Sequence, residues 1–145
     1  MEDPHLFPES ISPMQIPGFH LSLGVEDLPW RATSYPGVDW YLLASEGQDG
    51  GTEEGATVLI RMAPGRGYPA HRHLGIEEVL VLAGGYRDHL GEHLAGSYLR
   101  YPAGSEHAPI ALGDKGQPEA STNPACVLFA CARGGTELLS QGADE

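Results

Sequence analysis

Short apolar runs separated by glycine and proline clusters constrain this chain more than any other feature. No segment keeps a 3.6-residue apolar period over the length of an ordinary helix. The chain of 145 residues is therefore predicted to form a single all-β domain, such as a sandwich, a jelly roll or a closed barrel. The runs with the length and composition of strands are HLSLGV, VDWYLLAS, TVLIRMA, IEEVLVLA, GSYLRY, EHAPIAL and ACVLFACA.

The two ends of the chain differ from this pattern. Residues 1–18 are rich in proline, which argues against a helix and predicts an extended N-terminal arm. Residues 136–145 are predicted to form a C-terminal tail after at most one helical turn. Within the domain, the run VLVL at 79–82 is apolar on both faces and predicts a strand that is covered on both sides.

The charge balance narrows the range of partners. The chain has 20 acidic and 8 basic residues, a net charge of −12, which repels nucleic acid and anionic membranes. No apolar run approaches the roughly 18 residues of a membrane span, and the N-terminus lacks the features of a signal peptide. We therefore expect a cytoplasmic protein. Cys126 and Cys131 lie on opposite faces of one predicted strand, so they cannot pair with each other there.

Two histidines and a glutamate follow one another in the stretch HRHLGIEE. His71 and His73 are two residues apart, so both side chains leave the same face of a strand. Imidazoles on one face can bind one cation through neutral ring nitrogens. Glu77 is an even number of residues from His71, so its side chain would leave the same face, whereas Glu78 would face away. Glu77 is therefore the favoured carboxylate ligand.

A further histidine follows the predicted turn PAG. This turn brings His107 onto the start of the next strand, where it becomes the candidate fourth ligand. Its neighbour Glu106 is interpreted either as a residue that hydrogen-bonds to a metal ligand or, preferably, as a charged side chain in solvent.

The spacing of these residues resembles the two motifs of the cupin superfamily. The first motif is Gly65, five residues, HRH, three residues, Glu77, six residues and Gly84. The second is Gly96, five residues, PAG, two residues and His107. Ala111 replaces an asparagine that is common in the family. The stretches PAHRHLGIEEVLVLAGGYRD and AGSYLRYPAGSEHAP are most similar to the cupin-like domain of the anti-sigma factor ChrR and its stand-alone relatives.

This resemblance implies a jelly-roll barrel over residues 19–135 and, as is common in the family, a homodimer. It also implies one divalent metal ion per chain, either Fe, Zn, Mn or Ni, in the lumen. The implied ligands are His71, His73, Glu77 and His107. A degenerate cupin without metal is the alternative, and it is disfavoured because unpaired buried charge is costly.

Three further residues are candidates for contact with a substrate, and two more histidines have metal-ligand spacing. Arg61, Tyr98 and Arg100 lie on predicted strands and would contact a substrate if they faced the lumen. A surface or dimer contact is the preferred interpretation for each. His89 and His93 have the spacing of a metal-binding helix, but Gly91 between them predicts an exposed hairpin turn.

Three functions are compatible with the implied site. The first is a metal-dependent, dioxygenase-like oxidoreductase acting on a small molecule. The second is a non-catalytic, zinc-binding sensor or regulatory module like that of ChrR. Residues 1–35 have no cysteine and are proline-rich, which argues against an anti-sigma role for the whole protein. The third is an isomerase or lyase that uses the metal as a Lewis acid. We favour the first, because an isolated domain has no second module through which to signal.

Overall fold

The computed structural model describes residues 28–47 and 54–139, and all regular elements in these ranges are strands. The all-β prediction is therefore confirmed for this part of the chain. The predicted arm at 1–18 and the strand predicted around HLSLGV lie outside the described residues. The described ranges hold no helix with the length and apolar character that crossing a bilayer requires.

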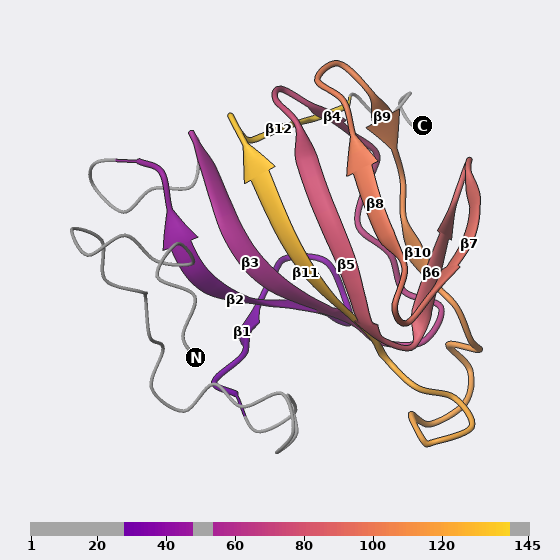
Figure 1. Cartoon of the computed structure of the whole chain (residues 1–145). Helices are drawn as coiled ribbons and strands as arrows, with labels where there is room; N and C mark the ends of the chain where they lie inside the picture. Colours follow the sequence, from indigo (N-terminus) through magenta and orange to yellow (C-terminus); the bar gives the residue numbers. More distant parts are fainter. Residues whose placement is uncertain (1–27, 48–53, 140–145) are drawn as a thin grey trace, which may run out of the picture.

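The strands form three antiparallel sheets (Figure 1). The largest has six strands in the spatial order β1 (Arg31–Ala32), β2 (Val38–Ser45), β3 (Gly55–Met62), β11 (Cys126–Arg133), β5 (Glu77–Ala83) and β8 (Tyr98–Tyr101). The second sheet has the order β10 (Ile110–Ala111), β6 (Gly85–Asp88) and β7 (Gly91–Leu94). The third has the order β12 (Thr136–Leu138), β4 (His71–His73) and β9 (Glu106–His107).

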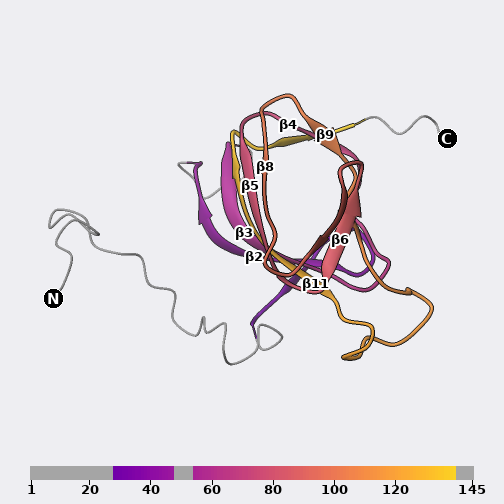
Figure 2. The same ribbon diagram turned by 45° about the vertical axis from the view of Figure 1, so that its right-hand side comes forward.

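Together the sheets surround a common interior, as the turned view shows (Figure 2). The six-stranded sheet forms one wall, β6 lies across from it, and β4 and β9 cross the top. The hydrogen-bonded ladders do not run continuously from sheet to sheet. The shell is therefore a jelly roll made of separate sheets rather than a continuously hydrogen-bonded barrel.

Alternation along the central strands places the core inside this shell. The core side chains come from both the large sheet and the β6 sheet, and include Met62, Val79, Tyr86, Leu128 and Ala130. Burial of such side chains stabilises the fold by roughly 1.5–3 kcal/mol for each large apolar group. On β11, Cys126 is buried within the core while Cys131 is partly exposed, and both are free thiols.

Two strand predictions need correction. The run EHAPIAL was expected to be one strand, but the structure splits it into β9, which pairs with β4, and β10, which pairs with β6. Pro109 lies between them, and it has no N–H to donate to a ladder. At the C-terminal end, residues 136–138 form β12 and pair with β4, where the sequence suggested a turn and a tail.

Gly84 shows why the chain needs a glycine at the end of β5. Its φ is +63°, and a Cβ built there would lie 2.3 Å from the carbonyl oxygen of Ala125. A side chain at this position would therefore force the backbones of β5 and β11 apart.

Candidate metal centre

The two short strands β4 and β9 bring three histidines together. His71 and His73 are buried on the same face of β4, with Arg72 pointing outward between them. His107 on β9 is the direct cross-strand partner of His71. Parity along a strand and antiparallel pairing therefore place three imidazoles on one inner surface.

Glu77 joins the histidines from the first position of β5. Gly75 lies between β4 and β5 and passes close to the carbonyl of Arg133, where a Cβ would lie only 2.2 Å from the oxygen. As parity predicts, Glu77 is 8% exposed and faces inward, while Glu78 faces outward and accepts a hydrogen bond from Tyr98.

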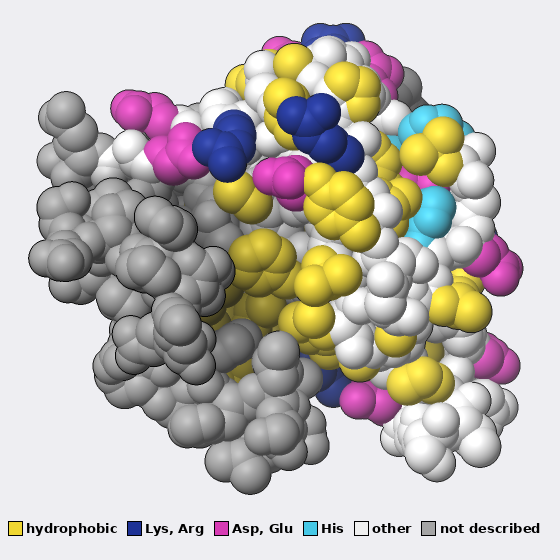
Figure 3. All heavy atoms as spheres, in the orientation of Figure 1, with side chains coloured by type: hydrophobic (Ala, Val, Ile, Leu, Met, Phe, Trp, Pro, Cys, Tyr) yellow, Lys and Arg dark blue, Asp and Glu magenta, His cyan; other side chains and the backbone are white. Residues whose placement is uncertain are grey.

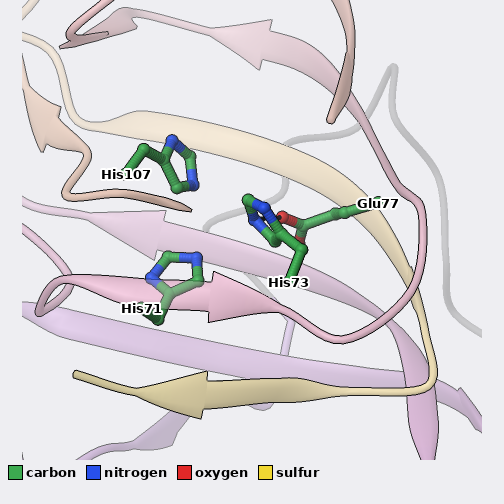
Figure 4. Close-up of side chains that lie close together, drawn as sticks. All are labelled: His71, His73, Glu77 and His107. Atoms are coloured by element: carbon green, nitrogen blue, oxygen red, sulfur yellow. Dashed lines mark ion pairs between the residues drawn. The ribbon is translucent and has the colours of Figure 1, made fainter. Parts of the chain in front are cut away.

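The four side chains converge on one point (Figure 4). One potential ligand atom from each of His71, His73, Glu77 and His107 lies within 4.8 Å of all the others, and all four residues are buried. The ring centroids of His71 and His107 are 4.7 Å apart, and each lies 4.9 Å from that of His73.

The hydrogen bonds of the histidines define which ring nitrogen faces the cluster. The partners of the three Nδ1 atoms are the Pro69 carbonyl, Ser105 Oγ and the Asp88 carboxylate. The carbonyl and the carboxylate can only accept, and Ser105 Oγ already donates its proton to the Pro102 carbonyl, so each Nδ1 carries a proton and donates it. Each Nε2 is left with a free lone pair, as a metal ligand requires. The Nδ1 contacts are His71 with the Pro69 carbonyl (2.9 Å), His73 with Ser105 Oγ (3.0 Å) and His107 with Asp88 Oδ2 (2.9 Å).

One contact within the cluster is unfavourable without a cation. His73 Nε2 lies 2.6 Å from Glu77 Oε1, yet it has no hydrogen-bond partner although it is fully buried. A lone pair facing a carboxylate oxygen at this distance is repulsive unless a positive charge lies nearby. A divalent cation bound by both atoms removes the repulsion, so the residues fit a metal ion.

The acid–base properties of the histidines agree with this fit. Burial lowers the pKa of His71, and burial likewise lowers the pKa of His107 to about 4. Both rings are thus neutral near pH 7, the form that binds metal ions.

The sequence did not reveal the residues that hydrogen-bond to the cluster from behind. Asp88 at the end of β6 accepts from His107 and also from Tyr101 Oη at 2.6 Å. Tyr101 in turn bonds to Tyr86 Oη at 2.5 Å. An aspartate before a hairpin turn is typical of turns, so its pattern offers no functional signal. Ser105 is one of the two residues between PAG and His107, where the second motif specifies no residue type, so the motif did not single it out.

The other candidate residues lie away from the cluster. Arg61 pairs with Glu119, and Glu106 pairs with Arg72. Tyr98 donates a hydrogen bond to Glu78, and Arg100 is exposed. His93 bonds to Asp88 at 2.8 Å, while His89 is exposed in the β6–β7 turn.

The cluster forms part of the wall of an interior cavity of about 350 Å³. His71, Glu77 and His107 line it, and most of the remaining wall is apolar, with Val58, Ile60, Met62, Val79 and Leu128 among the lining side chains. No lysine or arginine of the described residues lines the cavity. Its volume lies in the range of small-molecule sites.

Comparison with known families gives a clear result. Residues 20–118 match the model of the ChrR cupin-like domain family. The chain belongs to that family. No protein with a curated description matches this cupin in sequence.

Solved structures with the same fold include proteins of different activities. The complex of Rhodobacter sphaeroides SigE with the anti-sigma ChrR is 28% identical, with a TM-score of 0.58. The match covers 75% of this cupin but only 50% of that chain, so the cupin corresponds to about half of it. An acetylacetone dioxygenase from Acinetobacter johnsonii is 13% identical, with a TM-score of 0.62 and coverages of 90% and 84%.

A third similar structure is the polyketide cyclase RemF from Streptomyces resistomycificus. It is 17% identical, with a TM-score of 0.58 and coverages of 90% and 89%. The low identities of the dioxygenase and the cyclase establish the cupin fold alone. The cupin jelly roll inferred from the two motifs is thereby confirmed.

Proposed function

We propose that this cupin is a metal-dependent oxidoreductase of the dioxygenase type that acts on a small molecule. The observation that carries the proposal is the combination of one buried three-histidine, one-glutamate cluster with an adjoining apolar cavity. His71, His73, Glu77 and His107 would hold one divalent ion, with Fe, Mn, Ni and Zn as the candidates. A bound redox-active ion would supply electron transfer and Lewis acidity to a chelated substrate.

The cavity wall indicates which class of substrate the protein would bind. The apolar side chains exclude water and favour an uncharged carbon skeleton. Because no described lysine or arginine lines the cavity, phosphorylated or polycarboxylate substrates would lack a counter-charge. Burial raises the pKa of Tyr68, so its phenol stays protonated and can donate to a substrate oxygen.

An oxygen-electrode screen with β-diketones and aryl ketones tests this proposal. The protein is purified without added metal, its metal content is measured, and each compound is then tested with and without O₂. Oxygen uptake that requires both the metal and one compound supports the dioxygenase. Conversion that proceeds equally without O₂ contradicts it and favours the isomerase or lyase reaction.

A second candidate, a zinc-binding sensor module, is favoured by the similarity to ChrR. Zn²⁺ in a closed four-ligand site is redox-inert. Purified protein with tightly held zinc and no reaction with any compound would favour the sensor, whereas iron or manganese would favour the oxidoreductase.

We further propose that the cupin is a homodimer formed through the outer face of its six-stranded sheet. Leu80 is 38% exposed although the sequence predicts cover on both sides of its strand. Hydrophobic side chains lie between charged ones on the face in Figure 3, which looks onto this sheet. Register places an apolar row across it, formed by Tyr41, Leu59, Phe129, Leu80 and Tyr98. Leu59 is already fully buried within the chain, so Leu80 and Tyr98 form the exposed end of this row.

Light scattering after size exclusion tests the dimer. The wild-type protein is expected to have twice the chain mass, and Leu80→Arg is expected to be a monomer. Leu90→Arg is the matched control, because Leu90 is also exposed but lies in the β6–β7 turn. A monomeric wild-type protein contradicts the proposal. A cytoplasmic location stays a prediction, and the two free thiols agree with a reducing compartment.

A further inference from the structure

Asp88 is the most heavily hydrogen-bonded side chain near the cluster. It ends β6, and its side chain is fully buried. Oδ2 accepts from Tyr101 and His107, while Oδ1 accepts from the His93 ring at 2.8 Å and from the backbone N–H of Leu90 at 2.9 Å. Four donors therefore fix both carboxylate oxygens in place.

These contacts set the direction of the hydrogen bonds around Asp88. All four come from groups that can donate, so both carboxylate oxygens act as acceptors. A carboxylate without a proton can only accept, so Tyr101 must donate to Asp88. The single proton of Tyr86 then goes to Tyr101, and the network has one direction throughout.

Asp88 differs in charge from the partners of the other two histidines. His71 donates to a backbone carbonyl and His73 donates to a hydroxyl, both of which are neutral. A carboxylate partner makes the imidazole a stronger base and fixes the orientation of the ring. Of the three histidines, His107 is therefore the one whose Nε2 is both oriented and electronically strengthened.

We infer that Asp88 is a positioning residue that orients His107 and thereby sets the affinity for the metal ion. This inference rests on the proposed metal site. It assigns a role to a residue that does not itself contact the ion.

The test is a titration of the metal-free full-length protein with Co²⁺, followed by equilibrium dialysis and visible absorption. Asp88→Ala is expected to weaken Co²⁺ binding by about 10–100-fold and to change the absorption spectrum. Asp88→Asn is expected to lose less, because its amide oxygen can still accept from His107 while the charge is gone. Circular dichroism of each metal-free variant reports folding, and Asp88→Asn carries the test if Asp88→Ala does not fold.

Glu106→Gln is the matched control. Glu106 precedes His107 in the sequence, but its side chain is exposed and pairs with Arg72. The variant is expected to bind Co²⁺ within a few-fold of the wild type. The inference is overturned if the Asp88 variants bind like the wild type with the same spectrum, or if Glu106→Gln loses as much affinity as they do. A wild-type protein that binds no Co²⁺ overturns the proposed metal site itself.

Discussion

His71 and His107 are direct partners across the β4–β9 ladder, and their ring centroids lie 4.7 Å apart. Two strands of only three and two residues thus bring together the two halves of the candidate site. Because antiparallel partners share a face of the sheet, this pairing fixes the position of His107 relative to both histidines of β4.

Replacement of Glu77 is expected to abolish tight metal binding. Glu77→Ala removes the one carboxylate in the cluster. It should reduce the affinity for the metal ion by more than the roughly 10–100-fold that is lost when a residue hydrogen-bonded to a ligand is removed. Glu78→Ala is the control, since Glu78 is adjacent in sequence but faces outward. Equilibrium dialysis measures both. Equal affinities of the two variants would contradict the assignment of Glu77.

Acid is expected to destabilise the metal-free protein through its buried histidines. In the unfolded chain a histidine has a pKa near 6.5, whereas in the folded protein the pKa of His107 is about 4 and that of His71 is also lowered. As the pH falls from about 6.5 towards 4, the unfolded chain takes up protons first. The contribution of these histidines to the free energy of unfolding is therefore complete above pH 6.5 and decreases below it.

Urea denaturation of chelator-treated protein at pH 7 and pH 5 measures this effect. Other groups also titrate in this range, so the decisive quantity is the difference between the wild type and His107→Gln. The wild type should lose more stability than the variant between the two pH values. An equal loss in both proteins would show that His107 is not the source.

Filling the cavity is expected to separate ligand binding from metal binding. Val58→Phe places a larger side chain in the apolar wall, so it should weaken binding of a chelating diketone to the metal-loaded protein. Its metal stoichiometry should stay that of the wild type. Thr57→Phe is the control on the neighbouring position, whose side chain points away from the cavity. Calorimetry of ligand binding is the measurement, and unchanged affinity in Val58→Phe would place the ligand elsewhere.

Two glycines allow backbone strain to be compared with a steric clash. Gly84 and Gly104 both have positive φ, but a Cβ at Gly104 would have no atom within 4 Å. Gly104→Ala should therefore cost only the conformational penalty of about 1–2 kcal/mol. Gly84→Ala should cost clearly more, because its Cβ meets the Ala125 carbonyl. Thermal and urea denaturation compare them, and equal losses would argue against the close β5–β11 approach.

The sequence could predict the four clustered side chains because local rules govern their placement. His71 and His73 share a face through strand parity, and the spacing of the two motifs relates His107 to them. Asp88 could not be found in this way, because its partners come from β7, β8 and β9 and meet it only after the sheets have packed. The split of EHAPIAL has a similar cause, since β9 and β10 pair with strands of different sheets.

Anomalous X-ray scattering from crystals of the purified protein tests the central claim most directly. Data collected on both sides of the absorption edge of each candidate metal identify the element and its position together. We predict one peak per chain, bounded by the Nε2 atoms of His71, His73 and His107 and by the carboxylate of Glu77. Metal-loaded crystals with no peak among these four side chains, or with the peak elsewhere, would contradict the account.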